Sequence, residues 1–239
     1  MTSPTVLHTT HGDIPLAECR IAVGGREWAV AYSAAVVSQK DENRFLKEKT
    51  DWMPYGVALW PAALAMAHEI ATRADEFRGR TVLELGAGTG LPGIVAAALG
   101  ASVVQTDRSE LITHVCRMNG ERNRMTGIEY RLADWTEWDD PKRYDWMIGS
   151  DVLYADSLHD SLRRIFDENL VPGGRLLMAD PYRAYSLLFM EDLERSGWKI
   201  THSRWSIGEG DSARPIAVYE LRADSPLPPR ASGQANPQV

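Results

Sequence analysis

One glycine-rich loop between an apolar run and a helix pattern constrains the fold of this chain more than any other stretch. Residues 81–85 read Thr-Val-Leu-Glu-Leu, a run typical of a buried parallel strand, and residues 86–93 follow with Gly-Ala-Gly-Thr-Gly-Leu-Pro-Gly. Residues 94–99 then give a compact apolar helix pattern that Gly100 closes. Glycines let a backbone turn sharply and approach a ligand closely, so this stretch predicts a loop for a nucleotide cofactor. Three glycines alone also serve ordinary turns.

A second strand pattern ends in an acidic residue that strengthens the cofactor interpretation. Residues 101–106 read as a short strand, and Asp107 follows it, 21 positions after Gly86 (107 − 86). A carboxylate at the tip of the second strand of a βαβ unit is where a ribose hydroxyl pair is held. The other role open to Asp107 is N-cap of the following helix, although Ser109 can also fill that role.

Length and charge limit the classes of protein that fit. A chain of 239 residues can bury one sizeable core, so one domain with extensions is expected. The net charge of −7 argues against broad electrostatic binding to nucleic acid or to anionic membranes. No signal-peptide pattern and no apolar run of about 18 residues is present, so the sequence predicts neither export nor a membrane span. We therefore expect a cytoplasmic protein, with a monomer as the default state.

Cysteine and histidine usage gives no sign of a metal centre. Cys19 and Cys116 are the two cysteines, and their separation is not of a metal-binding type, so we expect reduced thiols. His8 and His11 form an H-x-x-H pattern, but without a helix, a carboxylate cluster or further ligands a zinc site is incomplete.

The two ends of the chain differ in character from its middle. We expect residues 1–18 to be irregular, residues 19–32 to form a β-hairpin around Gly24-Gly25, and residues 39–50 to be a charged connector or short helix. Residues from 223 onward are rich in proline, serine and glycine, which is typical of a disordered tail. The predicted organisation is an N-terminal extension over 1–50, a core domain over 51–222 and a tail over 223–239.

Polar and aromatic residues follow the third strand of the core domain. After a helix over 109–122, residues 128–132 read as a strand that ends in Ala133, Asp134 and Trp135. A carboxylate can accept a hydrogen bond from the exocyclic amine of adenine while an indole packs on the ring. A loop aspartate beside a surface-packed tryptophan is the alternative.

The fourth strand, over 144–150, runs directly into Asp151-Val152-Leu153-Tyr154. In a doubly wound sheet this strand lies beside the first, so side chains at its end face the ligand crevice. Asp151 and Tyr154 are therefore the candidates for the reactive end, although either can instead brace the helix that starts near Asp156. Trp60, just before the first-turn Pro61 of a helix, fits either a pocket wall or core packing.

The remaining elements complete an alternating pattern. A helix over 156–169, a turn at 171–174, a strand over 175–179, a helix over 184–196 and an antiparallel pair over 198–205 and 214–221 are expected. Asp180-Pro181-Tyr182 looks superficially like the D-P-P-Y of amino-methylating DNA enzymes, but it lacks a proline and follows the fifth strand. The predicted fold class is α/β: a doubly wound, Rossmann-like, mostly parallel sheet of seven strands with a closing antiparallel pair and a small N-terminal hairpin.

This pattern resembles the class I, seven-strand methyltransferases that bind S-adenosylmethionine. Residues 84–90, Glu-Leu-Gly-Ala-Gly-Thr-Gly, are closer to the first motif of that family than to the dinucleotide G-x-G-x-x-G. Leu59-Trp60-Pro61, Asp134-Trp135 and Asp151-x-x-Tyr154 are similar to the protein-lysine branch called methyltransferase family 16. Asp180-Pro181 with Arg183 is similar to its electron-transfer-flavoprotein lysine methyltransferases, and residues 106–111 to its histone-arginine-methylating relatives.

The resemblance implies a set of site residues and a role for each. The cofactor site would be built by Trp60, Glu84, Gly86, Gly88, Gly90, Asp107, Asp134, Trp135 and Ser150. Asp151 would orient the ammonium of the acceptor, and Tyr154 would form an aromatic wall or a cation–π contact. The implied activity is N-methylation of lysine side chains in a protein substrate. Methylation of arginine or of a small amine, or cofactor binding without turnover, stays open, and the glycine spacing disfavours a dehydrogenase.

Overall fold

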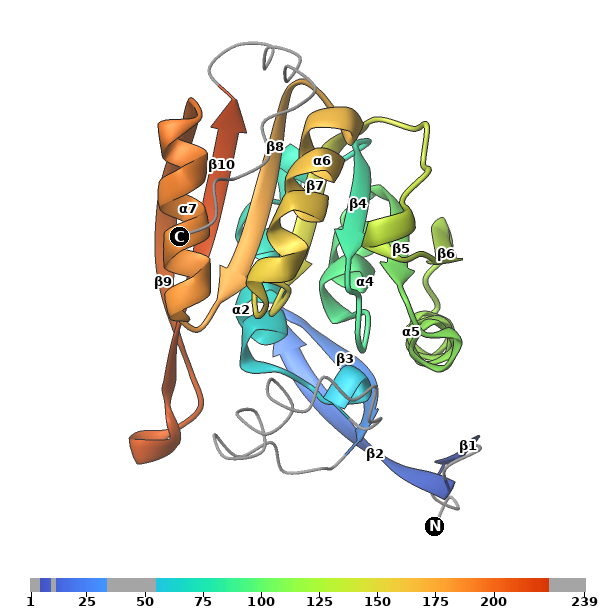
Figure 1. The fold of residues 1–239 in the computed structure, drawn as a ribbon. Coiled ribbons are helices and arrows are strands. Elements are labelled where there is room, and N and C mark those ends of the chain that lie inside the picture. The colour runs from blue at the N-terminus through green and yellow to red at the C-terminus, as the bar shows by residue number, and fades with distance from the viewer. Residues whose placement is uncertain (1–4, 10–11, 34–54, 224–239) are drawn as a thin grey trace.

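The computed structural model describes residues 5–9, 12–33 and 55–223, which form two sheets with helices around them (Figure 1). The larger sheet has seven strands: β4 (Thr81–Leu85), β5 (Ser102–Asp107), β6 (Ile128–Leu132), β7 (Tyr144–Ser150), β8 (Leu170–Asp180), β9 (Trp198–Ile207) and β10 (Arg214–Ala223). The helices are α2 (Pro61–Thr72), α3 (Ala74–Phe77), α4 (Leu91–Ala98), α5 (Glu110–Arg122), α6 (His159–Asn169) and α7 (Ala184–Arg195). Short 3-10 turns are η1 (Tyr55–Val57), η2 (Trp135–Glu137), η3 (Asp156–Leu158) and η4 (Gly210–Ser212).

The large sheet is doubly wound, as predicted. Its strand order is β6-β5-β4-β7-β8-β10-β9, and β10 pairs antiparallel with both β8 and β9 while the other neighbours are parallel. The chain runs outward from β4 to β6, returns to β7 on the other side of β4, continues to β8 and to the edge strand β9, and places β10 between those two. The topological switch point therefore lies between β4 and β7, where the carboxyl ends of parallel strands create a ligand crevice.

Helices cover both faces of this sheet, with α6 and α7 in front of it and α2 behind it in Figure 1. Strand β7 shows why. Trp146 and Ile148 pack in one apolar cluster with α2 and α4, whereas Met147 packs in a second cluster with α6 and α7. A strand buried on both faces needs apolar residues at successive positions, and that is the pattern that marked these strands in the sequence.

The N-terminal sheet is more extensive than the predicted hairpin. It contains β1 (Thr5–Thr9), β2 (Gly12–Val23) and β3 (Arg26–Ser33) in that order, with β2 and β3 joined at Gly24-Gly25. The expectation of an irregular segment over residues 1–18 is therefore wrong for residues 5–9 and 12–18. Leu7 and Leu16 are buried in a cluster with Ala31 and Val57, so tertiary packing orders a stretch whose local signal is weak. In Figure 1 this sheet lies below the carboxyl ends of β4 and β5.

Other element boundaries differ only locally from expectation. Strand β8 begins at Leu170, so the turn expected at 171–174 is wrong; Leu170 pairs with Tyr144 across a register shift. The helix expected from Asp156 begins as η3 and becomes α6 at His159. The connector expected at 39–50 and most of the predicted tail lie outside the described residues, so the division of the chain at residues 50 and 222 stays a prediction.

The described residues contain two free thiols, with Cys19 half-buried and Cys116 buried. His8 lies in β1, and His11 falls outside the described part of the chain. Within that part, no three His, Cys, Asp or Glu side chains are grouped as a metal site. Nor is any helix there both long and apolar enough to cross a membrane.

Candidate functional site

The glycine loop leaves β4 at the switch point and adopts a backbone that only glycine tolerates well. Gly86, Gly88 and Gly90 have φ values of +66°, +56° and +79°. A Cβ built on Gly86 would lie 2.8 Å from Cγ1 of Val152 and 3.3 Å from Cζ2 of Trp135. Gly86 therefore has two reasons to be glycine, a left-handed backbone and a close approach by two side chains. The loops that follow β4, β6 and β7 meet at this residue.

Asp107 joins the glycine loop to the start of α5. It ends β5, is 9% exposed, and its Oδ2 accepts a hydrogen bond of 3.3 Å from the backbone N–H of Gly88. Its Oδ1 accepts one of 3.3 Å from the N–H of Ser109, the residue that precedes α5. Burial raises the pKa of the Asp107 carboxyl to about 6, although these backbone bonds act against the increase. Asp107 thus supports the helix entry and also lies against the loop.

Glu84 lies beneath the glycine loop. Its side chain is 2% exposed, and Oε2 accepts hydrogen bonds from the backbone N–H of Gly93 at 3.1 Å and from Nε2 of Gln105 at 2.5 Å. The same Gln105 nitrogen donates to the Gly90 carbonyl at 2.8 Å. Burial raises the pKa of Glu84 to about 8, so the carboxyl is largely protonated at neutral pH. These bonds make Glu84 a support of the loop, and its predicted contact with the cofactor stays a prediction.

Asp134 and Trp135 follow β6, as expected, but they differ in exposure. Asp134 is exposed, and its Oδ1 accepts hydrogen bonds from the Thr136 hydroxyl at 2.7 Å and the Thr136 N–H at 2.8 Å. Those bonds, with the charge of Arg108, hold the pKa of Asp134 below its usual range. Trp135 is half-buried with its ring beside Gly86. Asp134 therefore caps the turn η2 and Trp135 faces the glycine loop, and their predicted contacts with adenine stay predictions.

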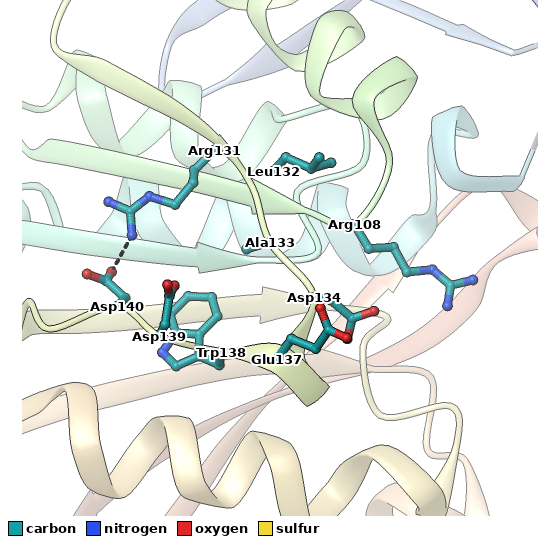
Figure 2. Close-up of a pocket in the computed structure, with 9 residues that line it drawn as sticks. All are labelled: Arg108, Arg131, Leu132, Ala133, Asp134, Glu137, Trp138, Asp139 and Asp140. Carbon is teal, nitrogen blue, oxygen red and sulfur yellow. Dashed lines mark ion pairs between the residues drawn. The ribbon is translucent and has the colours of Figure 1, made fainter.

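A cavity of about 300 Å³ lies at the carboxyl end of β6 (Figure 2). It is lined by Arg108, Arg131, Leu132, Ala133, Asp134, Glu137, Trp138, Asp139 and Asp140. Arg131 forms an ion pair of 2.8 Å with Asp140 on one side of it, and Arg108, Asp134 and Glu137 lie at the other side in Figure 2. Arg108 directly follows Asp107, so the cavity adjoins the two segments predicted to hold a nucleoside.

A charged cluster lies at the end of β7, where the reactive end was predicted. Asp151 has a φ of +57°, and its Oδ1 lies 2.7 Å from Nη2 of Arg183. Arg183 also pairs with the fully buried Asp180 at 2.8 Å, and Asp180 accepts a hydrogen bond of 2.7 Å from the Ser186 hydroxyl. Two carboxylates therefore share one guanidinium. Val152 directly follows Asp151, and its Cγ1 lies close to the Cα of Gly86, within 2.8 Å of where a Cβ would be. The charged cluster is therefore one residue away from a side chain that packs on the glycine loop.

The other predicted site residues occupy the same edge of the sheet or the helix leading to it. Ser150 is the last residue of β7 and pairs with Ala179, and Tyr154 is half-buried in the segment before η3. Trp60 is half-buried at the N-terminus of α2, where its carbonyl accepts a hydrogen bond of 3.0 Å from Ala63. Their roles toward a ligand stay predictions.

The site also contains residues that pattern reasoning did not single out as functional. Arg183 lies 32 positions after Asp151, and no local spacing marks it as the partner of that carboxylate. Gln105 looks like one more residue of β5, yet its amide supports both Glu84 and Gly90. A polar residue inside an otherwise apolar strand was the signal for Gln105, because a buried amide needs hydrogen-bond partners.

Comparison with known proteins agrees with this geometry. A family model described as lysine methyltransferase matches residues 39–196, more than half of the chain. Protein N-lysine methyltransferase METTL21A from Danio rerio is 32% identical over 189 residues, covering 74% of this chain and 83% of the relative. METTL21A from Xenopus tropicalis is 35% identical over 136 residues, covering 54% of this chain and 63% of the relative. The chain thus spans less than two thirds of the Xenopus relative's length.

Solved structures share the fold at low sequence identity. The T. thermophilus 16S rRNA N2 G1207 methyltransferase, in complex with AdoMet and guanosine, superposes with a TM-score of 0.58 at 16% identity, covering 92% of this chain and 58% of its own. The N-methyltransferase NodS from Bradyrhizobium japonicum, in complex with S-adenosyl-L-homocysteine, gives a TM-score of 0.56 at 14% identity, covering 78% and 98%. The family match, together with the doubly wound sheet and the glycine loop, shows that the chain belongs to the lysine methyltransferase family of class I enzymes, whose cofactor is S-adenosylmethionine.

Proposed function

We propose that this protein transfers a methyl group from S-adenosylmethionine to the amine of lysine side chains in a protein substrate. The observation that carries the proposal is the ion pair of Asp151 and Arg183 at the end of β7. Asp151 directly precedes Val152, whose side chain packs against Gly86 of the cofactor loop. An acidic group at that point can receive a cationic side chain beside the cofactor. The names of the METTL21A relatives support lysine in proteins as the acceptor.

The residues at the switch point fit S-adenosylmethionine. Asp107 is a buried carboxylate at the tip of the second strand, where it can accept hydrogen bonds from two ribose hydroxyls. Gly86 has no side chain and the ring of Trp135 lies close to it, an arrangement that suits the flat adenine ring of the cofactor. When bound, S-adenosylmethionine supplies a methyl group on a sulfonium, which a neutral amine can attack in line. Asp107, Gly86, Gly88 and Trp135 are the residues that we expect to hold it.

The chain's main task toward the acceptor is to present a neutral, oriented amine. A lysine with a pKa of about 10.4 costs roughly 4.6 kcal/mol to deprotonate at pH 7. A lone carboxylate would raise that cost by favouring the ammonium form. Asp151 is not alone, because Arg183 pairs with it at 2.7 Å and with Asp180 at 2.8 Å. The cluster therefore keeps a net negative charge that attracts the acceptor, while Arg183 limits how strongly Asp151 holds the proton on it.

Binding of the cofactor should weaken in acid because of Asp107. Burial raises the pKa of this carboxyl to about 6, and a protonated carboxyl loses acceptor capacity toward the ribose hydroxyls. We expect the Kd of S-adenosylhomocysteine to rise about 10-fold between pH 7.5 and pH 5, measured by calorimetry. Asp107→Asn should weaken binding at pH 7.5 and flatten this dependence. Asp134→Asn is the control, because the pKa of Asp134 is already lowered and the residue should not titrate in this window.

Replacing Asp151 with asparagine should separate acceptor orientation from cofactor binding. Asparagine tolerates the left-handed backbone at this position, and Arg183 keeps its bond to Asp180. We expect methyl transfer to protein to fall about 10- to 100-fold, the effect of losing one hydrogen bond to a charged group. The Kd of S-adenosylhomocysteine should change by less than about 3-fold, which corresponds to less than about 0.7 kcal/mol.

The matched control is Asp156→Asn. Asp156 lies in the exposed turn η3 that follows the same strand, and its Oδ1 accepts a hydrogen bond of 2.8 Å from the backbone N–H of Ser157. This variant should retain full transfer. Full activity in Asp151→Asn, or equal losses in both variants, would show that Asp151 does not orient the acceptor. Tyr154→Phe tests the companion role, and an aromatic wall or cation–π contact predicts near-normal activity for Phe but loss for Tyr154→Ala.

The nature of the acceptor is tested by incubating the protein with methyl-labelled S-adenosylmethionine and a lysate of its own organism. Label on lysine in a protein band, located by mass spectrometry, is the expected result. Label on arginine would instead follow the histone-arginine methyltransferase METTL23 of Xenopus laevis, which is 34% identical over 106 residues. Label confined to small molecules, or cofactor binding without transfer, would overturn the proposal. The cytoplasmic location expected from the sequence stays a prediction, which fractionation of the same cells would test.

A further inference from the structure

Two asparagines of α5 clamp the edge of the N-terminal sheet. Asn119 donates from Nδ2 to the Ala31 carbonyl at 3.0 Å, and its Oδ1 accepts from the Ala31 N–H at 2.8 Å. Asn123 makes the same pair of bonds with Ala29, at 2.8 Å and 3.0 Å. Each side-chain amide therefore bonds to a residue of β3 as a neighbouring strand would. These bonds satisfy backbone N–H and C=O groups on the edge of β3 that no strand among the described residues pairs with.

The spacing of the two asparagines matches the strand they hold. Four residues of an α-helix advance about 6 Å, and two residues of a β-strand advance about 6.6 Å. Positions 119 and 123 on the helix can therefore reach alternate residues of β3, whose intervening residue Val30 pairs with Cys19 in β2. This agreement explains why an Asn-x-x-x-Asn pattern in the sequence can dock a strand along a helix.

The two asparagines differ in one further contact. Nδ2 of Asn119 also donates to the Thr89 carbonyl, at 2.9 Å, so this amide bonds to the N-terminal sheet and to the glycine loop at once. Nδ2 of Asn123 instead donates its other hydrogen bond to the Asn119 carbonyl within α5. Asn119 is fully buried, and its two amide hydrogens and its oxygen are all used. Its orientation is therefore determined by the strand and the loop together.

The glycine loop also contacts α5 through Val115 and Cys116, one turn before Asn119. Sγ of Cys116 donates to the Gly88 carbonyl at 3.0 Å, and Ala87 is buried in an apolar cluster with Ala31, Val57, Val115 and Cys116. The carbonyls of Gly88 and Thr89 therefore both point toward α5. In a trans peptide the following N–H points the opposite way, so these two bonds also set the direction of the N–H groups on the other side of the loop.

We infer that Asn119 is a positioning residue that makes cofactor affinity depend on the docking of the N-terminal sheet. The sheet contributes no residue to the predicted cofactor site. It acts through Ala31, Asn119 and the Thr89 carbonyl, which hold the glycine loop in its binding conformation. The inference rests on S-adenosylmethionine as the cofactor, and it does not depend on which acceptor is methylated. Coupling of this kind is reciprocal, so cofactor binding should also stabilise the docked strand.

The first test compares Asn119→Ala with Asn123→Ala. Each variant removes one side-chain clamp from β3, and Asn119→Ala alone also removes a bond to the glycine loop. Both should lower the urea midpoint of unfolding. Asn119→Ala should raise the Kd of S-adenosylhomocysteine about 10-fold, whereas Asn123→Ala should change it by less than about 3-fold, as expected when a single buried carbonyl loses its donor. Equal changes in Kd, or none in either variant, would show that Asn119 only anchors the strand.

The second test uses wild-type protein and does not depend on a destabilised variant. S-adenosylhomocysteine should slow hydrogen exchange of the Ala31 amide, which donates to Asn119, even though Ala31 is outside the predicted cofactor site. Asn119→Asp keeps an oxygen for the Ala31 N–H but has no amide hydrogens for Thr89, so it should abolish this slowing. Unchanged Ala31 exchange on ligand binding in wild type would overturn the inference. These readouts use binding alone, so a failure to find protein methylation would leave them intact.

Discussion

Replacing Gly86 with alanine should abolish measurable binding of S-adenosylhomocysteine while leaving a folded protein. The new methyl group would lie 2.8 Å from Val152, which is too short a contact, and 3.3 Å from Trp135, which is a tight one. The φ of +66° adds about 1–2 kcal/mol of backbone strain, and overpacking adds about 1–3 kcal/mol. The loop can relieve both by moving, but it then leaves the geometry that suits the ligand. We expect the Kd in calorimetry to rise at least about 100-fold, which corresponds to about 2.7 kcal/mol.

Gly79→Ala is the matched control for backbone strain. Gly79 has a φ of +70°, close to that of Gly86, but a Cβ at this position meets no atom within 4 Å. Its alanine variant should therefore lose a similar amount of stability from strain and bind the ligand as the wild type does. Normal binding in Gly86→Ala would mean that the side chains of Val152 and Trp135 can move away from the new methyl group. Cofactor binding would then not require a residue without a side chain at position 86.

The sequence predicted the large sheet well because the signals there are local. Apolar runs that alternate with helix patterns mark strands buried on both faces, and the loop after Leu85 has three glycines that the backbone needs at positive φ. Strands β5, β6 and β7 end at Asp107, Leu132 and Ser150, as predicted, and parallel strands bring these carboxyl ends to one edge of the sheet.

The supports behind that edge were not predictable from local pattern. Arg183 reaches Asp151 only because β7 and β8 are neighbours, and Asn119 reaches Ala31 only because the N-terminal sheet docks on α5. Each pair is far apart in sequence, and each polar residue has an ordinary role as a surface or helix residue when considered alone. Residues 5–9 and 12–18, which were expected to be irregular, lie in β1 and β2 for the same reason. Their few apolar side chains pack against residues of distant elements.

Glu84 also shows that one residue type at one position can serve either of two purposes. The family resemblance assigns it to the cofactor, whereas its carboxyl bonds to Gly93 and Gln105 beneath the loop. A carboxyl that is 2% exposed and has a pKa of about 8 is a neutral hydrogen-bonding group in much of the physiological range. The observed bonds of Glu84 are therefore those of a loop support whose protonation couples to folding.

That coupling predicts a pH dependence of stability with a definite sign. The folded-state pKa of Glu84 is raised from 4.5 to about 8, so the folded protein binds a proton that the unfolded chain releases above pH 4.5. This contribution to stability is fully present below about pH 4.5 and is lost progressively as the pH rises to about 8, at up to about 1.36 kcal/mol per pH unit. Glu84→Gln keeps the neutral shape and cannot ionise. Its free energy of unfolding, relative to wild type, should therefore increase by several kcal/mol between pH 5 and pH 8, measured by urea titration of the apo protein.

Glu69→Gln provides the control of opposite sign. Burial acts to raise the pKa of Glu69, but hydrogen bonds from Ser203, Trp205 and Arg73 outweigh it and lower the pKa below 4.5. Glu69 stays ionised in both the folded and unfolded chain above that value, so the stability difference between Glu69→Gln and wild type should be constant from pH 5 to pH 8. It should shrink only as the pH falls below about 4.5, because the stabilising charge is then lost. A constant difference for Glu84→Gln over the same range would mean that the buried carboxyl ionises as it does in the unfolded chain, and that its bonds to Gly93 and Gln105 compensate for burial.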